Sequence, residues 1–109
     1  RIMTTSKFVF SDDVVISFEL IGHSGAGEEC TDIVCSAVSS AVYMAANTII
    51  EIMKLNPEAE VRDGYLKFTM NVDDARKSKT ITDGLYLHLS ELQGQYPNNL
   101  KLERGVFDA

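Results

Sequence analysis

A histidine and a cysteine with the chemistry of a catalytic pair stand twelve positions apart, as His23 and Cys35. A cysteine attacks as the thiolate, which forms most readily at a helix N-terminus or beside a protonated imidazole. Gly22 precedes the histidine, and Gly25 and Gly27 follow it, so the intervening chain has the conformational freedom to fold back. These residue types indicate a nucleophile with a general base.

Cys35 opens the strongest helical pattern in the sequence. Asp32 or Thr31 is suited to cap this helix, which places Cys35 in the first turn, where backbone N–H groups and the helix dipole favour an anion. N–H groups at or near Cys35 and Ser36 could then hold an oxyanion. Asp32 has a second possible role, as the carboxylate that orients the imidazole of His23, and we favour its role as the helix N-cap.

The remaining pattern predicts an α+β domain of order ββαββαβ, in which a mostly antiparallel sheet is covered by two helices. Alternating residues predict a first hairpin, whose second strand turns Val14, Ile16, Phe18 and Leu20 toward the core, and Asp63-Gly64 predicts a second hairpin. Apolar residues at helical spacing predict the helices, and the stripe of the first helix ends with Ile49, Ile52 and Met53. The charged run before the second helix is expected to be a solvated loop. The expected strands are 2–10, 14–21, 59–62, 65–72 and 100–106, and the expected helices are 32–53 and 80–96.

Two blocks at fixed separation resemble the signature of the ribosomal-processing cysteine protease Prp family. They are Gly22-His23-Ser24 and the run 32–39, Asp-Ile-Val-Cys-Ser-Ala-Val-Ser. One position departs from the family pattern, because Cys30 stands where glycine is common. The resemblance covers the site region and agrees with a small α/β domain spanning residues 1–109.

The resemblance implies a cysteine endopeptidase whose catalytic dyad is His23 and Cys35. It also implies the substrate, a large-subunit ribosomal protein precursor whose N-terminal extension is removed, and a homodimeric enzyme. The loop containing Gly25 and Gly27 is expected to order over a bound peptide.

Composition limits the partners. The chain has 109 residues, a net charge of -6 and two cysteines, Cys30 and Cys35. Phosphates would be repelled, so direct nucleic-acid binding is not expected, whereas a basic protein or peptide is a suitable partner. So few cysteines indicate a reducing, cytoplasmic location. Neither a membrane-spanning segment nor a metal or other cofactor is expected.

Two other classes of protein remain open at this point. One is a non-catalytic peptide-binding or ribosome-assembly module, in which the histidine and cysteine are structural. The other is a thiol redox protein that forms a bond between Cys30 and Cys35, although their spacing differs from the C-x-x-C of thioredoxin-like enzymes.

Overall fold

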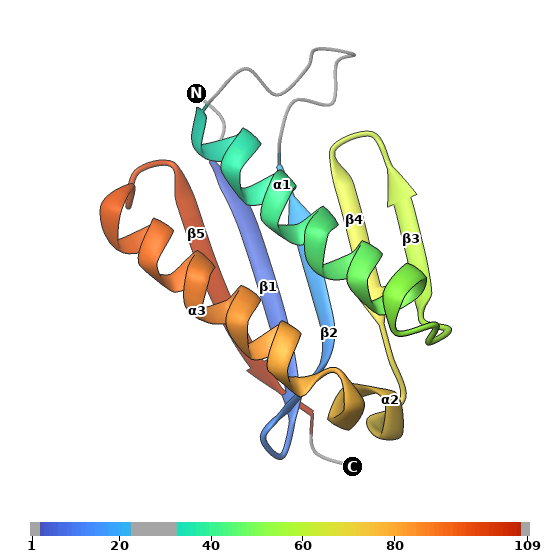
Figure 1. Cartoon of the computed structure of the whole chain (residues 1–109). Coiled ribbons are helices and arrows are strands. Elements are labelled where there is room, and N and C mark those ends of the chain that lie inside the picture. Colours follow the sequence, from blue (N-terminus) through green and yellow to red (C-terminus); the bar gives the residue numbers. More distant parts are fainter. Residues whose placement is uncertain (1–2, 23–32, 108–109) are drawn as a thin grey trace.

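The fold, seen in a computed structural model that describes residues 3–22 and 33–107, is a sheet with helices packed on one face (Figure 1). The expected α+β class is confirmed, whereas the expected two helices and the order ββαββαβ are wrong, because a further short helix precedes the last long one. The elements are β1 (Thr4–Ser11), β2 (Val14–Ile21), α1 (Ile33–Asn47), the π-helix η1 (Thr48–Ile52), β3 (Glu58–Arg62), β4 (Tyr65–Thr69), α2 (Val72–Lys77), α3 (Lys79–Gln95) and β5 (Leu100–Val106).

The sheet has five strands in the order β3-β4-β2-β1-β5. Three neighbouring pairs are antiparallel, and β1 with β5 is parallel, so the sheet is mixed. Its helix-covered face carries a row of stacked aromatic rings, in which Phe18 lies 5.0 Å from Phe68 and 5.8 Å from Phe8 between ring centroids. Burial of these large rings is the main stabilising contribution to this layer.

A bulge in β2 changes which residues of that strand face the core. Val9 pairs with Ser17 and Phe10 pairs with Val15, so Ile16 is the extra residue. Strict alternation predicted that Val14, Ile16, Phe18 and Leu20 share the core face. Ile16 packs against the core but is only partly buried, and the phase shift caused by the extra residue leaves Val15 fully buried, which strict alternation did not predict.

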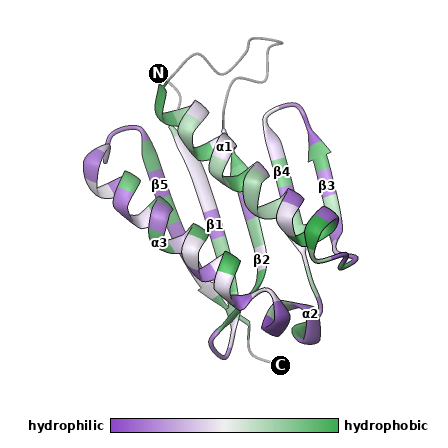
Figure 2. Ribbon diagram, in the orientation of Figure 1, coloured by the Kyte–Doolittle hydropathy of each residue, from purple (hydrophilic) through white to green (hydrophobic). Residues whose placement is uncertain are grey.

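Helix α1 supplies the second layer of the core. Its buried side chains fall at helical spacing and comprise Val34, Cys35, Val38, Val42, Ala45 and Ala46. Figure 2 shows the apolar composition of α1 and η1 against the more mixed α3. By length and composition alone, residues Ile33–Ile52 could cross a membrane, a test that core helices of globular proteins also pass. Here the apolar stripe packs into the core beneath it.

The π-helix η1 changes which residues end the apolar stripe of α1. Ile52 was expected to continue it, but the side chain is 77% exposed, while Ile49 is buried and Met53 partly buried. The N–H of Met53 donates to the carbonyl of Thr48, five residues back, at 2.9 Å. The wider turn delays the next inward position by about one residue, which turns Ile52 outward.

The charged run after β4 is helix α2, which corrects the expected loop. The side chain of Asn71 caps it by accepting the N–H of Asp74 at 2.8 Å. Asp73 and Asp74 lie in the first turn and Arg76 and Lys77 in the last, which complements the helix dipole. Ala75 is fully buried beneath these charges.

The second face of the sheet carries polar side chains instead of helices. Strand pairing places one row of alternating charge across all five strands, here called the charged row: Glu60, Lys67, Glu19, Lys7 and Glu103. Opposite charges on neighbouring strands are favourable pairs. This face therefore has the character of a solvated surface.

Candidate active site

Cys35 lies in the first turn of α1, as the sequence predicts, and its side chain is only 3% exposed. Ser36, the next residue, is exposed. The N–H groups of a first helical turn are directed toward the N-terminal end of the helix, where the dipole favours negative charge. Both a thiolate and a developing oxyanion would be stabilised at this end of α1.

The sulfur of Cys35 is part of a disulfide in the structure. A disulfide sulfur cannot form the thiolate that attacks a carbonyl, so the structure represents an oxidised form of this side chain. Cys30, the other cysteine of the sequence, lies outside the described residues.

Gly22 lies immediately after β2 and precedes His23. Its backbone has φ +102°, and a Cβ added there would stand 2.7 Å from the carbonyl oxygen of Met3. The N–H of Gly22 donates to the carbonyl of Gly64 at 3.2 Å. A residue with a side chain is therefore excluded twice, by the left-handed backbone and by the lack of space.

The end of β2 and the start of α1 lie at the same end of the sheet (Figure 1). The turn between β3 and β4 belongs to this end too, since Gly64 contacts Gly22. The described residues on either side of the segment 23–32 thus converge on one end of the molecule.

A polar cluster follows the same turn on the open face. The hydroxyl of Tyr65 donates to a carboxylate oxygen of Glu19 at 2.6 Å, and the guanidinium of Arg62 lies 4.1 Å from the centre of the Tyr65 ring. The hydrogen bond to Glu19 is the main cause that raises the pKa of Tyr65 to about 12, assisted by burial and by the nearby carboxylate charge. The cluster ties β4 to β2 next to Gly22.

The other predicted site residues, His23, Gly25, Gly27 and Asp32, lie outside the described residues. Their assignment stays a prediction, as does the mobility expected for their loop. Within residues 3–22 and 33–107, no group of three or more His, Cys, Asp or Glu side chains is placed to hold a metal ion.

Comparison with known proteins decides the family. The family model for cysteine protease Prp matches residues 3–101 of the chain. The chain belongs to the cysteine protease Prp family. It is therefore a cysteine peptidase, which agrees with the nucleophile expected from the sequence.

Relatives of known sequence or structure agree with this assignment. The ribosomal processing cysteine protease Prp of Bacillus subtilis is 29% identical over 101 residues, covering 87% of this chain and 90% of that protein. The fold is similar to that of the S. aureus Prp protease crystallised with a substrate peptide, with a TM-score of 0.81 and 22% identity over 94% of this chain and 99% of that one. A Streptococcus mutans protein gives a TM-score of 0.82 at 22% identity, covering 96% and 99% of the two chains.

The contacts that hold this end of the Prp fold together were missed in the sequence. Asp63-Gly64 was recognised as a turn, but its contact with Gly22 joins residues far apart in the chain. The bond between Tyr65 and Glu19 likewise depends on the pairing of β2 with β4. The sequence showed a glutamate and a tyrosine in two separate predicted strands. It did not show that these two strands are neighbours in the sheet.

Proposed function

We propose that this Prp-family peptidase removes the N-terminal extension of a large-subunit ribosomal protein precursor with a catalytic dyad of Cys35 and His23. The observation that carries the proposal is the position of Cys35 in the first turn of α1. This helix begins at the end of the sheet where β2 ends and Gly22 follows. Family membership supplies the class of reaction.

The proposed reaction passes through a thioester. His23 takes the proton of the Cys35 thiol, and the thiolate attacks the scissile carbonyl to form a tetrahedral oxyanion. Backbone N–H groups near Cys35 and Ser36 stabilise this charge. The intermediate collapses as the imidazolium protonates the leaving amine, and water then hydrolyses the thioester to release the acid and restore the thiol. Asp32 caps α1 and could also orient His23.

The net charge of the chain and the name of its B. subtilis relative support the proposed substrate. The chain has a net charge of -6, which attracts a basic polypeptide and repels nucleic acid. The B. subtilis relative is named for ribosomal processing. We further propose that residues 1–109 act as one protease domain, in a cytoplasmic homodimer, without a cofactor.

The decisive experiment is incubation with an N-terminally extended ribosomal protein precursor, with the product read by mass spectrometry. Cys35→Ala should abolish cleavage, and His23→Ala should reduce kcat/KM by about 1,000-fold or more, because loss of a catalytic group removes most of the activity of a nucleophile and base that act together. Cys30→Ala is the matched control, a second thiol outside the proposed dyad. Full cleavage by Cys35→Ala would disprove the mechanism.

Reductant dependence provides an independent check on the nucleophile. Because the Cys35 sulfur is in a disulfide in the structure, oxidised protein should be inactive and regain activity with dithiothreitol. Alkylation of the reduced protein should then occur selectively at Cys35 and slow in His23→Ala. Equal, slow reaction of both thiols would instead favour a non-catalytic peptide-binding module.

A further inference from the structure

Strand β3 is an exposed edge of the sheet. Among the five described strands it pairs only with β4, and all five of its residues are exposed. An edge strand presents unpaired backbone N–H and C=O groups to which another extended chain can add. The opposite edge, β5, is partly covered, because the N–H of Leu102 donates to the side-chain oxygen of Gln93 on α3 at 2.5 Å.

The two faces of β3 differ in chemistry. Strand pairing places Glu58, Glu60 and Arg62 on the open face of the sheet. Ala59 and Val61 alternate with them on the side of the helices, and Val61 is 60% exposed. An added strand would therefore meet two carboxylates and one guanidinium on one face and a small apolar surface on the other.

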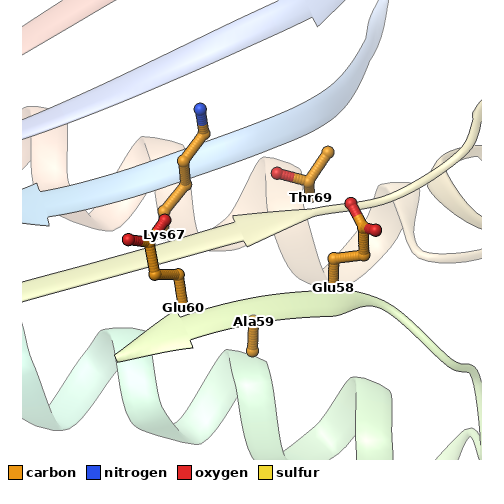
Figure 3. Close-up of a pocket in the computed structure, with 5 residues that line it drawn as sticks. All are labelled: Glu58, Ala59, Glu60, Lys67 and Thr69. Carbon is orange, nitrogen blue, oxygen red and sulfur yellow. The ribbon is translucent and has the colours of Figure 1, made fainter. Parts of the chain in front are cut away.

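A hollow of about 310 Å³ lies along this edge, lined by Glu58, Ala59, Glu60, Lys67 and Thr69. In Figure 3 the side chains of Glu58 and Glu60 extend from the same side of the sheet as Lys67 and Thr69, whereas Ala59 points the opposite way. The space is sufficient for one long side chain.

One carboxylate of this hollow is available for a cation. Glu60 forms an ion pair with Arg62 at 3.3 Å. Among the contacts of residues 3–22 and 33–107, Glu58 has no ion pair of its own. A lysine or arginine entering the hollow would meet this carboxylate beside the ammonium of Lys67, and it would be attracted by the net negative charge of the whole protein.

We propose that the β3 edge is an exosite that binds an extended basic segment of the polypeptide substrate as an additional strand. The identity of this occupant as substrate rests on the proposed function. Alternate basic residues of the segment face Glu58 and Glu60, and the residues between them face Ala59 and Val61. Backbone pairing supplies affinity, and the side chains supply selectivity.

The exosite is continuous with the proposed active site. β3 ends at Arg62, and the following turn places the carbonyl of Gly64 on the N–H of Gly22, next to His23. A strand added to β3 lies three strand spacings from β2, roughly 14 Å, which about four to five extended residues span. One polypeptide can therefore occupy the β3 edge and reach the end of β2 that leads to His23.

Peptide binding tests the exosite without requiring cleavage. The probe is a synthetic peptide of about nine residues that alternates lysine with valine, a length typical of a long strand, added to isotope-labelled Cys35→Ala protein. Amide shifts should concentrate in β3 and β4, and Glu58→Lys should weaken Kd about tenfold. Glu91→Lys makes the same charge change on an exposed position of α3 and should leave Kd within about twofold.

Cleavage kinetics provide the second measurement. Glu58→Lys should lower kcat/KM for a precursor with a basic segment about tenfold, mainly through KM, and leave kcat/KM for a short peptide around the scissile bond unchanged.

If the wild-type protein cleaves nothing while the peptide still shifts the amide signals of β3, the proposed function fails and the exosite stands. Cleavage without shifts at β3, or equal effects of Glu58→Lys and Glu91→Lys, overturns the exosite. Concentration-dependent shifts at β3 without peptide would identify a second copy as the occupant, which also overturns it.

Discussion

Cys35 of the proposed dyad and Gly22, which precedes the other member, His23, are held in place by different kinds of interaction. Cys35 is carried by a helix whose apolar side is buried against the sheet, so its position depends on side-chain packing. Gly22, which leads to His23, is held by backbone geometry, a hydrogen bond to Gly64 and close contact with Met3. Packing tolerates small changes in side-chain size, whereas a left-handed backbone in contact with a carbonyl tolerates none.

This difference predicts that the histidine side is the more sensitive of the two to a single methyl group. A substitution at Gly22 should lower activity because it shifts the backbone that leads to His23. A substitution on the buried side of α1 should lower the free energy of unfolding more than it lowers activity.

The largest effect is expected from Gly22→Ala. The added Cβ would clash with the Met3 carbonyl and hold a non-glycine residue at φ +102°, at a cost of about 2–3 kcal/mol in the free energy of unfolding. A shift of about 1 Å in His23 would reduce kcat/KM about 100-fold. Denaturant unfolding and cleavage kinetics measure the two effects.

Gly84→Ala is the matched control for that substitution. Gly84 lies inside α3, and beyond the helix's own nearby backbone no atom of the described residues lies within 4 Å of an added Cβ, so alanine should stabilise the protein by up to about 1 kcal/mol through helix propensity. Equal behaviour of the two glycine variants would show that the end of β2 is not rigidly held.

A smaller effect is expected from Val38→Ala, on the buried side of α1, the helix that carries Cys35. Val38 is fully buried, and losing part of its apolar surface should cost roughly 1–3 kcal/mol in the free energy of unfolding. The kcat/KM at a temperature where the variant is folded should change less than in Gly22→Ala. Met44→Ala, on the exposed side of the same helix, should be within about 0.5 kcal/mol of the wild type.

The smallest effect concerns pH and Tyr65. Because the folded protein raises the pKa of Tyr65 from 10.0 to about 12, the hydrogen bond to Glu19 contributes stability fully below pH 10. That contribution is lost as the pH rises through the folded pKa near 12. The difference in ultraviolet titration between the protein and Tyr65→Phe should show one phenol ionising near pH 12.

Glu19→Gln sharpens the same measurement. Glutamine keeps an acceptor for the Tyr65 hydroxyl but lacks the carboxylate charge, so the pKa of Tyr65 should fall part of the way toward its ordinary value. An unchanged titration would mean that this bond does not hold β4 to β2 in solution.

Local patterns predicted most of the elements, and the pairing of distant strands accounts for much of what was missed. The hairpin at Asp63-Gly64, the helix from Ile33 and the strand from Leu100 all follow from residue periodicity and turn chemistry. The parallel pairing of β5 with β1 depends on how the whole chain wraps, which periodicity does not encode.

Three local errors have local causes. The bulge at Ile16 and the π-helix before Ile52 each alter the phase of a regular repeat, so counting residues missed the burial of Val15 and wrongly placed Ile52 in the core. Helix α2 had a readable signal in Asn71, which caps it, and in its acid-to-base order of charges. That signal was outweighed by the high charge of a segment that buries little except Ala75.

Of the proposed active site, the sequence predicted the placement of Cys35 in a first helical turn. It could not predict how Gly22 is held, because Met3 and Gly64 approach it only after the sheet has formed. Residue type identified the chemistry, and tertiary contacts fix where that chemistry can occur.

The charged row has a consequence for crowded solutions. Its signs read the same from either end, negative at Glu60, Glu19 and Glu103 and positive at Lys67 and Lys7. Two molecules that stack these faces with their rows aligned, in either direction, bring like charges over like charges. The order of charges on the open face thus disfavours face-to-face stacking in the aligned register.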